Sequence, residues 1–473
     1  MSLEDLARLA IDKALEQDAE FAEFRYHLVS EEVVVLRDGE PEGPRTRFVE
    51  GVGIRVIVGG VPAFSSTNVI TERGVTSAVD EAVKAARAMG GLLGGAVRLS
   101  EAEASEVRYL VTEGRRWEDT PLEEKLEILR ELEEGLKERL RGVSSRRTLS
   151  LGLRRETKLV LNNSGAFVQA TTPLVWLRYR IALSSLGYHV EKVARLGGTG
   201  GLEVLDAQRV VDRVLEAAEN LREVLERGAS PPIGRMDIVV GCELAGLIAH
   251  ECVGHALEAD RIMGREEAQA GGSYVQGVGA RMGSEHVEVS DDPTIPSSAG
   301  YYLYDDEGVR ARKRRLVVGG EVRELLHNRE TAAHFGVDSN ASARASSYNR
   351  EPIVRMSNTF FEPGDYSLDE LLEDVKLGIY VKSCSEWNID DVRESQRYTG
   401  LEAYLVERGE VKAPVRSPVI DVSTQELLGS LDARGRDLEF HIGICVKGSP
   451  HQQIPVWTGG PTLRFRGIHV SRR

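Results

Sequence analysis

The chain has 473 residues, of which 41% are hydrophobic and 29% charged, and its acidic residues outnumber its basic ones by 75 to 60. This composition is typical of a globular protein long enough for two domains. The formal net charge of −15 argues against a nucleic-acid partner, because nucleic-acid-binding proteins usually carry a basic excess or a basic patch. The sequence has no run of eighteen apolar residues, so we expect no membrane-spanning helix and no membrane partner.

The cysteine content and the N-terminal sequence predict a cytoplasmic protein. The first residues, MSLEDLARLAIDKALEQ, carry acids where a secretory signal carries bases, and they lack its apolar core. Four cysteines are too few for a disulfide scaffold in a chain of this length. We therefore expect Cys242, Cys252, Cys384 and Cys445 to be free thiols or metal ligands.

The first ninety residues predict one helix–strand–helix unit. Apolar residues at helical spacing predict a helix over residues 3–16. Three strand-forming runs follow: FRYHLVS, EEVVVLR and a long one from Thr46 to Val58. A second helix is expected over residues 71–89.

A second unit repeats this order. The segment 90–121 is rich in glycine and acidic residues and is expected to connect the two units. An amphipathic helix is predicted over 121–140, and several strands follow it. A further helix is expected to be capped by Asp206 and to end at Gly228.

The chain is predicted to divide at its clearest linker, GASPPIG, which covers residues 228–234. Before it we expect an N-terminal α+β domain over 1–228, composed of the units 1–90 and 120–228. After it we expect a C-terminal domain over 235–473, in which a short strand precedes a helix and most of the remainder has β-pattern. The predicted fold class is α+β, with antiparallel strands in the helix-bearing N-terminal half and a metal-site helix in the β-rich C-terminal half.

The predicted helix over about 242–261 contains an HExxxH pattern, formed by His250, Glu251 and His255. Residues five apart lie about 140° apart on an α-helix and cannot share a metal ion. One extra residue in the turn, a π-bulge, would bring the two histidines onto one face, and such bulges concentrate at functional sites. We expect Gly254 to accommodate the distortion, because glycine is the least restricted residue.

Two histidines and a carboxylate this close together indicate a zinc site. Imidazole suits zinc, and a catalytic zinc ion usually has three protein ligands and one open position. In the HExxH peptidases, the glutamate of the motif is the general base, which is the role we expect for Glu251. The alternative, a helix with two unrelated surface histidines, is disfavoured because the motif is surrounded by apolar residues that indicate burial.

The third ligand is not adjacent in the sequence. Cys445 and Cys384 are equally good candidates on chemical grounds, because both can fold back from the C-terminal region. Either could instead be a buried thiol that only packs.

Several segments, in the same order, resemble those of the TldD/PmbA metallopeptidase family. The metal motif lies in AHECVGHALEAD, and RFVEGVGIRVIVGGVPAFSS is similar to the family's N-terminal strand pair. The segment YDDEGVRARKRRLVVGGEV resembles the family's DDEG segment and the hairpin after it. Three further segments resemble its C-terminal landmarks: SYNREPIVRMSNTFFEPGD, LEAYLVERGEVKAPV and CVKGSPHQQIPVWTGGPTL.

The resemblance implies one zinc ion per chain, bound by His250, His255 and Cys445, and so favours Cys445 over Cys384. It implies hydrolysis of peptides or unfolded protein segments through a zinc-bound water, with Glu251 as general base. It also implies a dimer, formed by two copies of the chain or with a TldE/PmbA-like paralogue. The alternative function is that of a non-catalytic, zinc-stabilised partner or regulatory subunit in such a complex.

Two departures from the family pattern stand out. The segment SCSEWNIDD, at 383–391, replaces a glycine-rich stretch and is expected to alter the substrate cleft, and Ala256 replaces the usual glycine after the second histidine. Arg355 and Asn358 are candidates for lining a peptide cleft, and a structural role in a strand is equally compatible with their positions.

Overall fold

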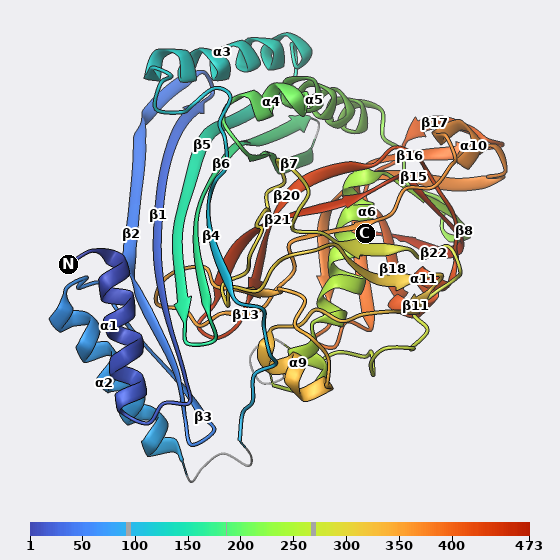
Figure 1. The fold of residues 1–473 in the computed structure, drawn as a ribbon. Helices are drawn as coiled ribbons and strands as arrows, with labels where there is room; N and C mark the ends of the chain where they lie inside the picture. Colours follow the sequence, from blue (N-terminus) through green and yellow to red (C-terminus); the bar gives the residue numbers. More distant parts are fainter. Residues whose placement is uncertain (91–95, 186, 266–270) are drawn as a thin grey trace.

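The N-terminal half of the computed structural model, which describes residues 1–90, 96–185, 187–265 and 271–473, is built on one large sheet (Figure 1). The sheet has seven strands in the order β3-β2-β1-β5-β6-β4, and β7 also pairs with β6. The strands are β1 (Phe21–Arg37), β2 (Glu40–Val58), β3 (Val61–Thr67), β4 (Ser105–Leu110), β5 (Ser144–Asn162), β6 (Ala166–Ser185) and β7 (Tyr188–Thr199).

Strands from both expected helix–strand–helix units join in this sheet, because β1 pairs antiparallel with β5 along most of its length. The segment 90–121 is more than the connector that its composition predicted. It contributes β4, whose residues Ser105–Leu110 pair in parallel with Ala166–Thr171 of β6. Alternate residues of β4 are half-buried, a short pattern that the surrounding acidic residues obscure.

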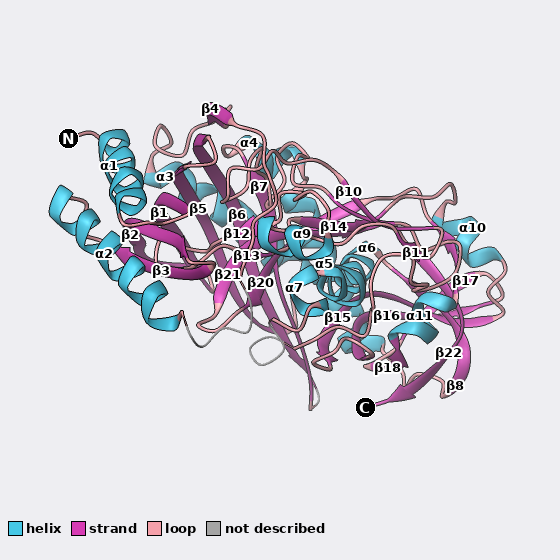
Figure 2. Cartoon of the chain, turned by 60° about the horizontal axis from the view of Figure 1, so that its bottom comes forward, coloured by secondary structure: helices cyan, strands magenta, loops and turns pink. Residues whose placement is uncertain are grey.

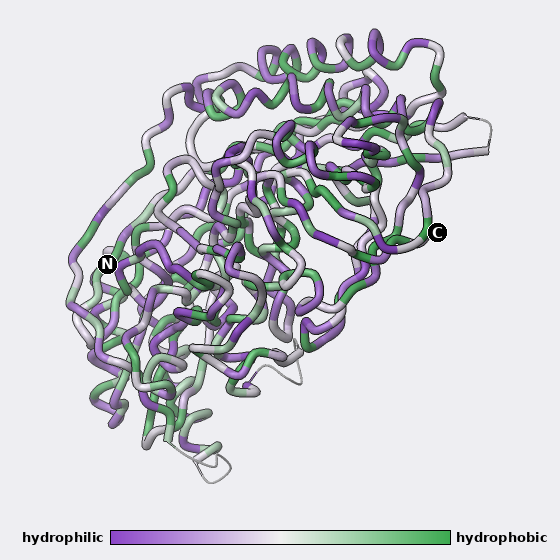
Figure 3. The backbone as a smooth tube through the Cα atoms, turned by 90° about the vertical axis from the view of Figure 1, so that its right-hand side faces the viewer, coloured by the Kyte–Doolittle hydropathy of each residue, from purple (hydrophilic) through white to green (hydrophobic). Residues whose placement is uncertain are grey.

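Helices cover the sheet at two places. They are α1 (Leu3–Glu16), α2 (Glu72–Met89), α3 (Leu122–Arg139), α4 (Glu203–Ala207) and α5 (Val210–Arg227). Helices α1 and α2 lie beside β1, β2 and β3 (Figure 2), while α3 and α5 pack together at the other end of the sheet. At the top of the view in Figure 3, where these two helices lie, hydrophobic and hydrophilic residues alternate along the helical turns, as in amphipathic helices.

The start of α5 differs from the prediction. Asp206 does not cap this helix, because it lies within the short helix α4. Arg209 adopts a left-handed backbone conformation, with φ at 51°, and this turn separates the two helices. The helix begins at Val210. Only its end, directly before Gly228, agrees with the prediction.

The C-terminal half contains two large sheets. One has six strands in the order β11-β10-β9-β14-β21-β20. In the other, which has seven, the pairings β15-β8-β22-β18-β16 and β16–β15 close a ring, to which β17 and β19 are attached. The strands of this half are β8 (Gly234–Val240), β9 (Val289–Asp291), β10 (Arg314–Val318), β11 (Glu321–Val322), β12 (Ala343–Arg344), β13 (Ile353–Val354), β14 (Asn358–Phe361), β15 (Leu377–Ile389), β16 (Ser395–Glu407), β17 (Glu410–Pro414), β18 (Pro418–Ser423), β19 (Leu431–Arg434), β20 (Glu439–Lys447), β21 (Gln452–Gly460) and β22 (Leu463–Arg472).

Helix α6 (Cys242–Ile248) lies between these two sheets. It contacts β14, β20 and β21 of the first sheet and β15 of the second. The largest apolar cluster of the protein surrounds it, with Leu244, Ile248 and Val253 fully buried. The other α-helices among the described residues of this half are short: α7 (Ala259–Ile262), α9 (Arg329–Phe335), α10 (Leu368–Glu373) and α11 (Thr424–Gly429).

The predicted α+β class is confirmed, with sheets in both halves and the motif helix in the β-rich C-terminal half. The domain boundary at 228–234 stays a prediction. Among the described residues, none of the helices has both the length and the apolar character needed to span a bilayer.

Candidate metal centre

The HExxxH motif lies in a distorted helix. Helix α6 continues as a π-helix over Ala249–Gly254 and then as a 3-10 turn over His255–Leu257. The wider π-turn brings His250 and His255 together, with ring centroids 4.8 Å apart and ring planes at 79°. The predicted π-bulge is therefore confirmed. The helix is not continuous to Arg261, because the extended backbone of Glu258, with φ −69° and ψ 115°, interrupts it.

Gly254 is required for a different reason from the one expected. Its backbone is ordinary helix, with φ −56° and ψ −57°. A Cβ atom at this position would lie 2.0 Å from the Sδ atom of Met356 and 3.3 Å from a methyl carbon of Thr359. Glycine is needed here because the strand region containing these residues approaches the helix closely, and not because the turn demands an unusual dihedral angle.

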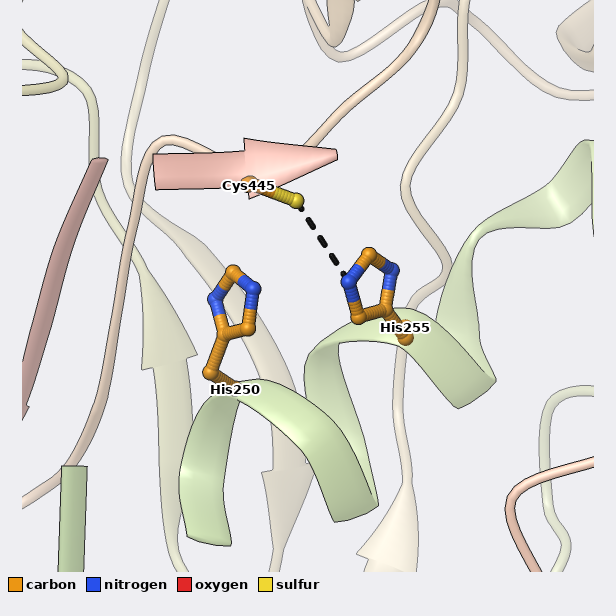
Figure 4. Close-up of side chains that lie close together, drawn as sticks. All are labelled: His250, His255 and Cys445. Carbon is orange, nitrogen blue, oxygen red and sulfur yellow. Dashed lines mark hydrogen bonds between the residues drawn. The ribbon is translucent and has the colours of Figure 1, made fainter. Parts of the chain in front are cut away.

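Cys445 comes from β20 and completes a buried group with the two histidines. Its Sγ atom lies 3.4 Å from Nε2 of His255 (Figure 4). One ligand atom from each of His250, His255 and Cys445 can be chosen so that all lie within 4.8 Å of one another, and the three residues are at most 5% exposed. Arg355 donates a hydrogen bond to the carbonyl oxygen of Cys445 at 2.7 Å, which fixes the strand at this point.

The two candidate cysteines lie in different environments. Burial opposes ionisation of the Cys445 thiol, but His255 and the guanidinium of Arg355 outweigh it and lower its pKa to about 7. Burial raises the pKa of Cys384 to about 12. Cys384 lines the same cavity but is not part of the group formed by the histidines and Cys445. Only Cys445 therefore combines the position and the thiolate character of a metal ligand.

The group has the donors and the spacing for one metal ion. Zinc bonds of about 2.0–2.3 Å place the ligand atoms of a tetrahedral site roughly 3.5 Å apart, close to the separation of Sγ and Nε2. Nδ1 of His250 is buried and has no hydrogen-bond partner among the described residues. Two imidazoles and a thiolate are ligands that zinc accepts readily.

Glu258 supports His255 from the side opposite Cys445. Its Oε2 atom lies 2.9 Å from Nδ1 of His255 and accepts a hydrogen bond from Nε of Arg261 at 2.7 Å. Lys447 is close as well, with Nζ 3.4 Å from Oε2 of Glu258 and 2.7 Å from Asp260. If Nδ1 of His255 donates its proton to Glu258, the lone pair of Nε2 faces Cys445 and can bind a metal.

Glu251 faces the same cavity as the metal-ligand candidates. The cavity has a volume of about 220 Å³, and His250, Glu251 and Cys445 are all in its wall. Burial favours the protonated form of Glu251, but His255, His250 and Arg393 outweigh it and hold its pKa below the usual range. A carboxylate oxygen of Glu251 lies 3.4 Å from the guanidinium of Arg393, which orients an ionised side chain.

Comparisons with known proteins identify the family of this chain. The sequence models of the PmbA/TldA metallopeptidase domain 1, central domain and C-terminal domain match residues 22–89, 115–223 and 233–472. A metalloprotease of Methanothermobacter thermautotrophicus is 32% identical over 459 residues, which cover 97% of this chain and 96% of the relative. This chain belongs to the TldD/PmbA metallopeptidase family.

Two further relatives of this TldD/PmbA family member extend the comparison. A protein of Saccharolobus solfataricus described as a zinc metalloprotease TldD homolog is 32% identical over 247 residues, covering 52% of this chain and 53% of the relative. The crystal structure of TldE from Thermococcus kodakarensis superimposes with a TM-score of 0.79 over 99% of both chains, at 16% sequence identity. At this identity the likeness shows the fold alone.

The segment 383–391, which was expected to depart from the family pattern, contributes to the candidate site. Cys384 and Trp387 are in the wall of the metal-site cavity, and Trp387 is also exposed to solvent. Arg355 and Asn358, in contrast, have structural roles. Both are fully buried, Arg355 donates to backbone carbonyls of β20 and β21, and Asn358 bonds to Gly300 and to Asp292.

Sequence reasoning missed Glu258 and Arg393. Glu258 follows His255 by three residues, a spacing that places neighbours on one helix face and could have identified it. Arg393 lies far from the motif in the sequence and reaches Glu251 only because the β15–β16 hairpin passes the site. No local sequence pattern predicts the contact between Arg393 and Glu251.

Proposed function

We propose that this chain is a zinc-dependent peptidase that hydrolyses peptides or unfolded protein segments. The observation that carries the proposal is the buried group of His250, His255 and Cys445 beside the carboxylate of Glu251 in one cavity. The names of the relatives support a metalloprotease, and one of them names zinc. The ligands would be the two histidines and Cys445, with one zinc ion per chain.

The role of general base is assigned to Glu251 because it lines the same cavity as the metal-ligand candidates. A zinc ion held by His250, His255 and Cys445 would polarise the scissile carbonyl and would lower the pKa of a water molecule in the site. Glu251 accepts a proton from the attacking water and delivers it to the leaving amine, so that water is added across the C–N bond. Arg393 keeps the Glu251 carboxylate directed into the cavity, and Glu258 holds His255 in the tautomer that binds metal.

The substrate must be extended or unfolded. In folded proteins, backbone carbonyls are buried or hydrogen-bonded within secondary structure. The group formed by the histidines and Cys445 is itself buried, and only a segment that leaves its own fold can bring a carbonyl to it. The four free thiols fit a cytoplasmic location. Membership of the TldD/PmbA family is the ground for proposing a dimer with a second copy or with a TldE/PmbA-like paralogue.

A pair of cysteine variants tests the metal assignment. Cys445→Ala should lose most of its zinc in elemental analysis of the purified protein, whereas Cys384→Ala, in the wall of the same cavity, should keep it. Wild-type protein should cleave casein and lose this activity to a chelator, and added zinc should restore it. Equal zinc in the two variants would contradict the ligand assignment. A zinc-loaded wild type that cleaves no unfolded substrate would favour the non-catalytic partner instead.

A further inference from the structure

A second, larger cavity adjoins the metal-site cavity. It has a volume of about 670 Å³ and lies between strands β1, β2, β5, β6 and β7 of the N-terminal sheet and residues 346–350, β20 and β21 of the C-terminal half. Strands β7 and β20, which meet between the two halves, contact each other along its border (Figure 1). Arg195 of β7 and Ile444 of β20 line both cavities, and Ile444 is the neighbour of Cys445.

This cavity is positively charged in an acidic protein. Four arginines line it, Arg47, Arg154, Arg195 and Arg350, and Glu31 is the only acidic residue in its lining. With histidine neutral, these groups carry a formal net charge of +3, whereas the whole chain carries −15. Arg154 is paired with Glu156, which lies outside the lining, at 2.5 Å, and with Glu31 at 3.1 Å. Glu31 also lies 3.7 Å from Arg47.

Arg195 is the member of this cluster best placed to bind an anion. Its guanidinium lies over the ring of Trp176, with Cζ 4.4 Å from the ring centroid. Among the described residues, no carboxylate lies within ion-pair distance of it. Burial and the like charge of Arg178, its partner across the β6–β7 pair, lower the pKa of Arg195. A bound anion would offset both by stabilising the charged guanidinium.

We propose that the Arg195 cluster, defined as Arg47, Arg154, Arg195 and Arg350, binds a carboxylate of the peptide substrate while the scissile bond lies at the metal site. This inference rests on the proposed peptidase function. The planar guanidinium matches a carboxylate through two parallel hydrogen bonds, and its contact with the ring of Trp176 restricts its movement. Because the two cavities share Arg195 and Ile444, an extended peptide can occupy both. The carboxylate comes either from an Asp or Glu side chain or from the peptide C-terminus.

The test measures binding and hydrolysis of three matched flexible peptides by zinc-loaded protein. One has a Glu side chain and an amidated C-terminus, one has Gln at that position and the same amide, and one has Gln and a free C-terminal carboxylate. Dissociation constants are measured on the Glu251→Gln variant so that the peptide stays intact, and kcat and KM are measured on the wild type. We expect the acidic peptides to bind about ten- to hundred-fold more tightly than the neutral one, as for a charge-assisted hydrogen bond.

Arg195→Gln should remove this preference and raise KM for acidic peptides, with little change in kcat or in the affinity for the neutral peptide. Arg178→Gln is the matched control, because it loses the same charge at the opposing position of the strand pair and lies outside the lining of both cavities. Arg195→Lys should recover only part of the preference, since a point charge cannot form the bidentate contact. If Arg195→Gln does not fold, as judged by circular dichroism, Arg350→Gln on the other wall of the cavity replaces it.

The outcomes separate this inference from the proposed function. A preference for the side-chain carboxylate or for the C-terminal carboxylate supports the inference and identifies the source. Binding that prefers acidic peptides in a protein that hydrolyses none of them would support the subsite and contradict the peptidase. Hydrolysis without any preference for acidic peptides, or an equal loss in Arg178→Gln and Arg195→Gln, would overturn the subsite and leave the peptidase standing.

Discussion

The β5–β6 part of the N-terminal sheet and the metal-site region of the C-terminal half are held together by different interactions. In the sheet, β5 and β6 run for 19 and 20 residues, and apolar side chains such as Leu151, Leu177 and Ile181 repeat along their buried stretches. Around the metal site, β9 has 3 residues and β12 has 2. Fully buried Arg314 and Arg355 lie there, bonded to Asp291 and to backbone carbonyls.

This difference shows what each region can tolerate. Apolar burial has no direction, so a sheet built on it can exchange side chains of similar volume at low cost. A buried charge depends on its one partner, and removing that partner leaves an uncompensated charge in a medium of low polarity. The metal-site region therefore gains fixed positions for its functional groups and loses tolerance to substitution.

The largest expected effect is a loss of peptide hydrolysis that leaves the folding of the metal-site region unchanged. Glu251→Gln keeps the shape of the side chain but removes its basicity, so hydrolysis should fall by about 10²–10⁴-fold. Zinc content and the thermal unfolding midpoint should stay close to those of the wild type, because Gln can still hydrogen-bond to Arg393. Peptide hydrolysis, elemental analysis and circular dichroism are measured on the same preparation.

Glu394→Gln is the matched control for this variant, because it makes the same chemical change next to Arg393 at an exposed position. It should keep its activity. Wild-type hydrolysis by Glu251→Gln would show that Glu251 is not the base.

The next largest effect compares two conservative substitutions, one in each region. Asp291→Asn removes the charge that faces fully buried Arg314 and weakens the bonds from Ser357 and Thr359, so we expect a loss of about 3–5 kcal/mol in the free energy of unfolding. Leu177→Met conserves volume in the apolar core of the sheet and should cost less than about 1.5 kcal/mol. Denaturant unfolding, followed by fluorescence, gives both values. Equal losses would mean that the two regions are stabilised in the same way.

Glu258→Gln tests a smaller effect, the support of a metal ligand by its neighbour. The amide accepts a hydrogen bond from His255 less strongly than the carboxylate, and it leaves Lys447 and Arg261 with one less counter-charge. Loss of such an outer partner typically weakens metal affinity about 10–100-fold. Competition between the protein and a chromophoric zinc chelator measures this, and an affinity equal to that of the wild type would exclude a role for Glu258 in holding His255.

The same contrast explains how much could be predicted from the sequence. Helices over 3–16, 71–89 and 121–140 were predictable because each has a continuous apolar face, and they are observed at Leu3–Glu16, Glu72–Met89 and Leu122–Arg139. The runs FRYHLVS and EEVVVLR, expected as separate strands, form the single strand β1, because no turn residue lies between them and β5 pairs along both.

The metal-site region was predictable only where chemistry fixes the spacing. The i, i+5 histidines required a π-turn, and the structure contains one. The residues alone could not choose between Cys445 and Cys384, since that choice depends on which strand end reaches the helix. The contacts of Gly254 with Met356 and of Arg393 with Glu251 join residues far apart in the chain, and no local pattern encodes them.

The smallest expected effect is a pH dependence that arises within the N-terminal sheet. His27 on β1 is fully buried, with Nδ1 3.4 Å from Arg25 and Nε2 3.8 Å from Glu156. Burial and the charge of Lys158 lower its pKa to about 4, against the partial opposition of Glu156, while an unfolded histidine titrates near 6.5. Between these values the unfolded chain binds a proton that the folded chain does not. The contribution of His27 to stability is therefore full above about pH 6.5 and falls as the pH decreases towards 4.

At pH 5.5 the wild type should have lost about 1 kcal/mol of its free energy of unfolding, relative to pH 7, through His27. His27→Gln should lack this part of the acid sensitivity, whereas His189→Gln, at an exposed position of β7, should retain it. Denaturant unfolding at the two pH values gives the difference, and an unchanged pH dependence in His27→Gln would show that the sheet does not hold this histidine neutral.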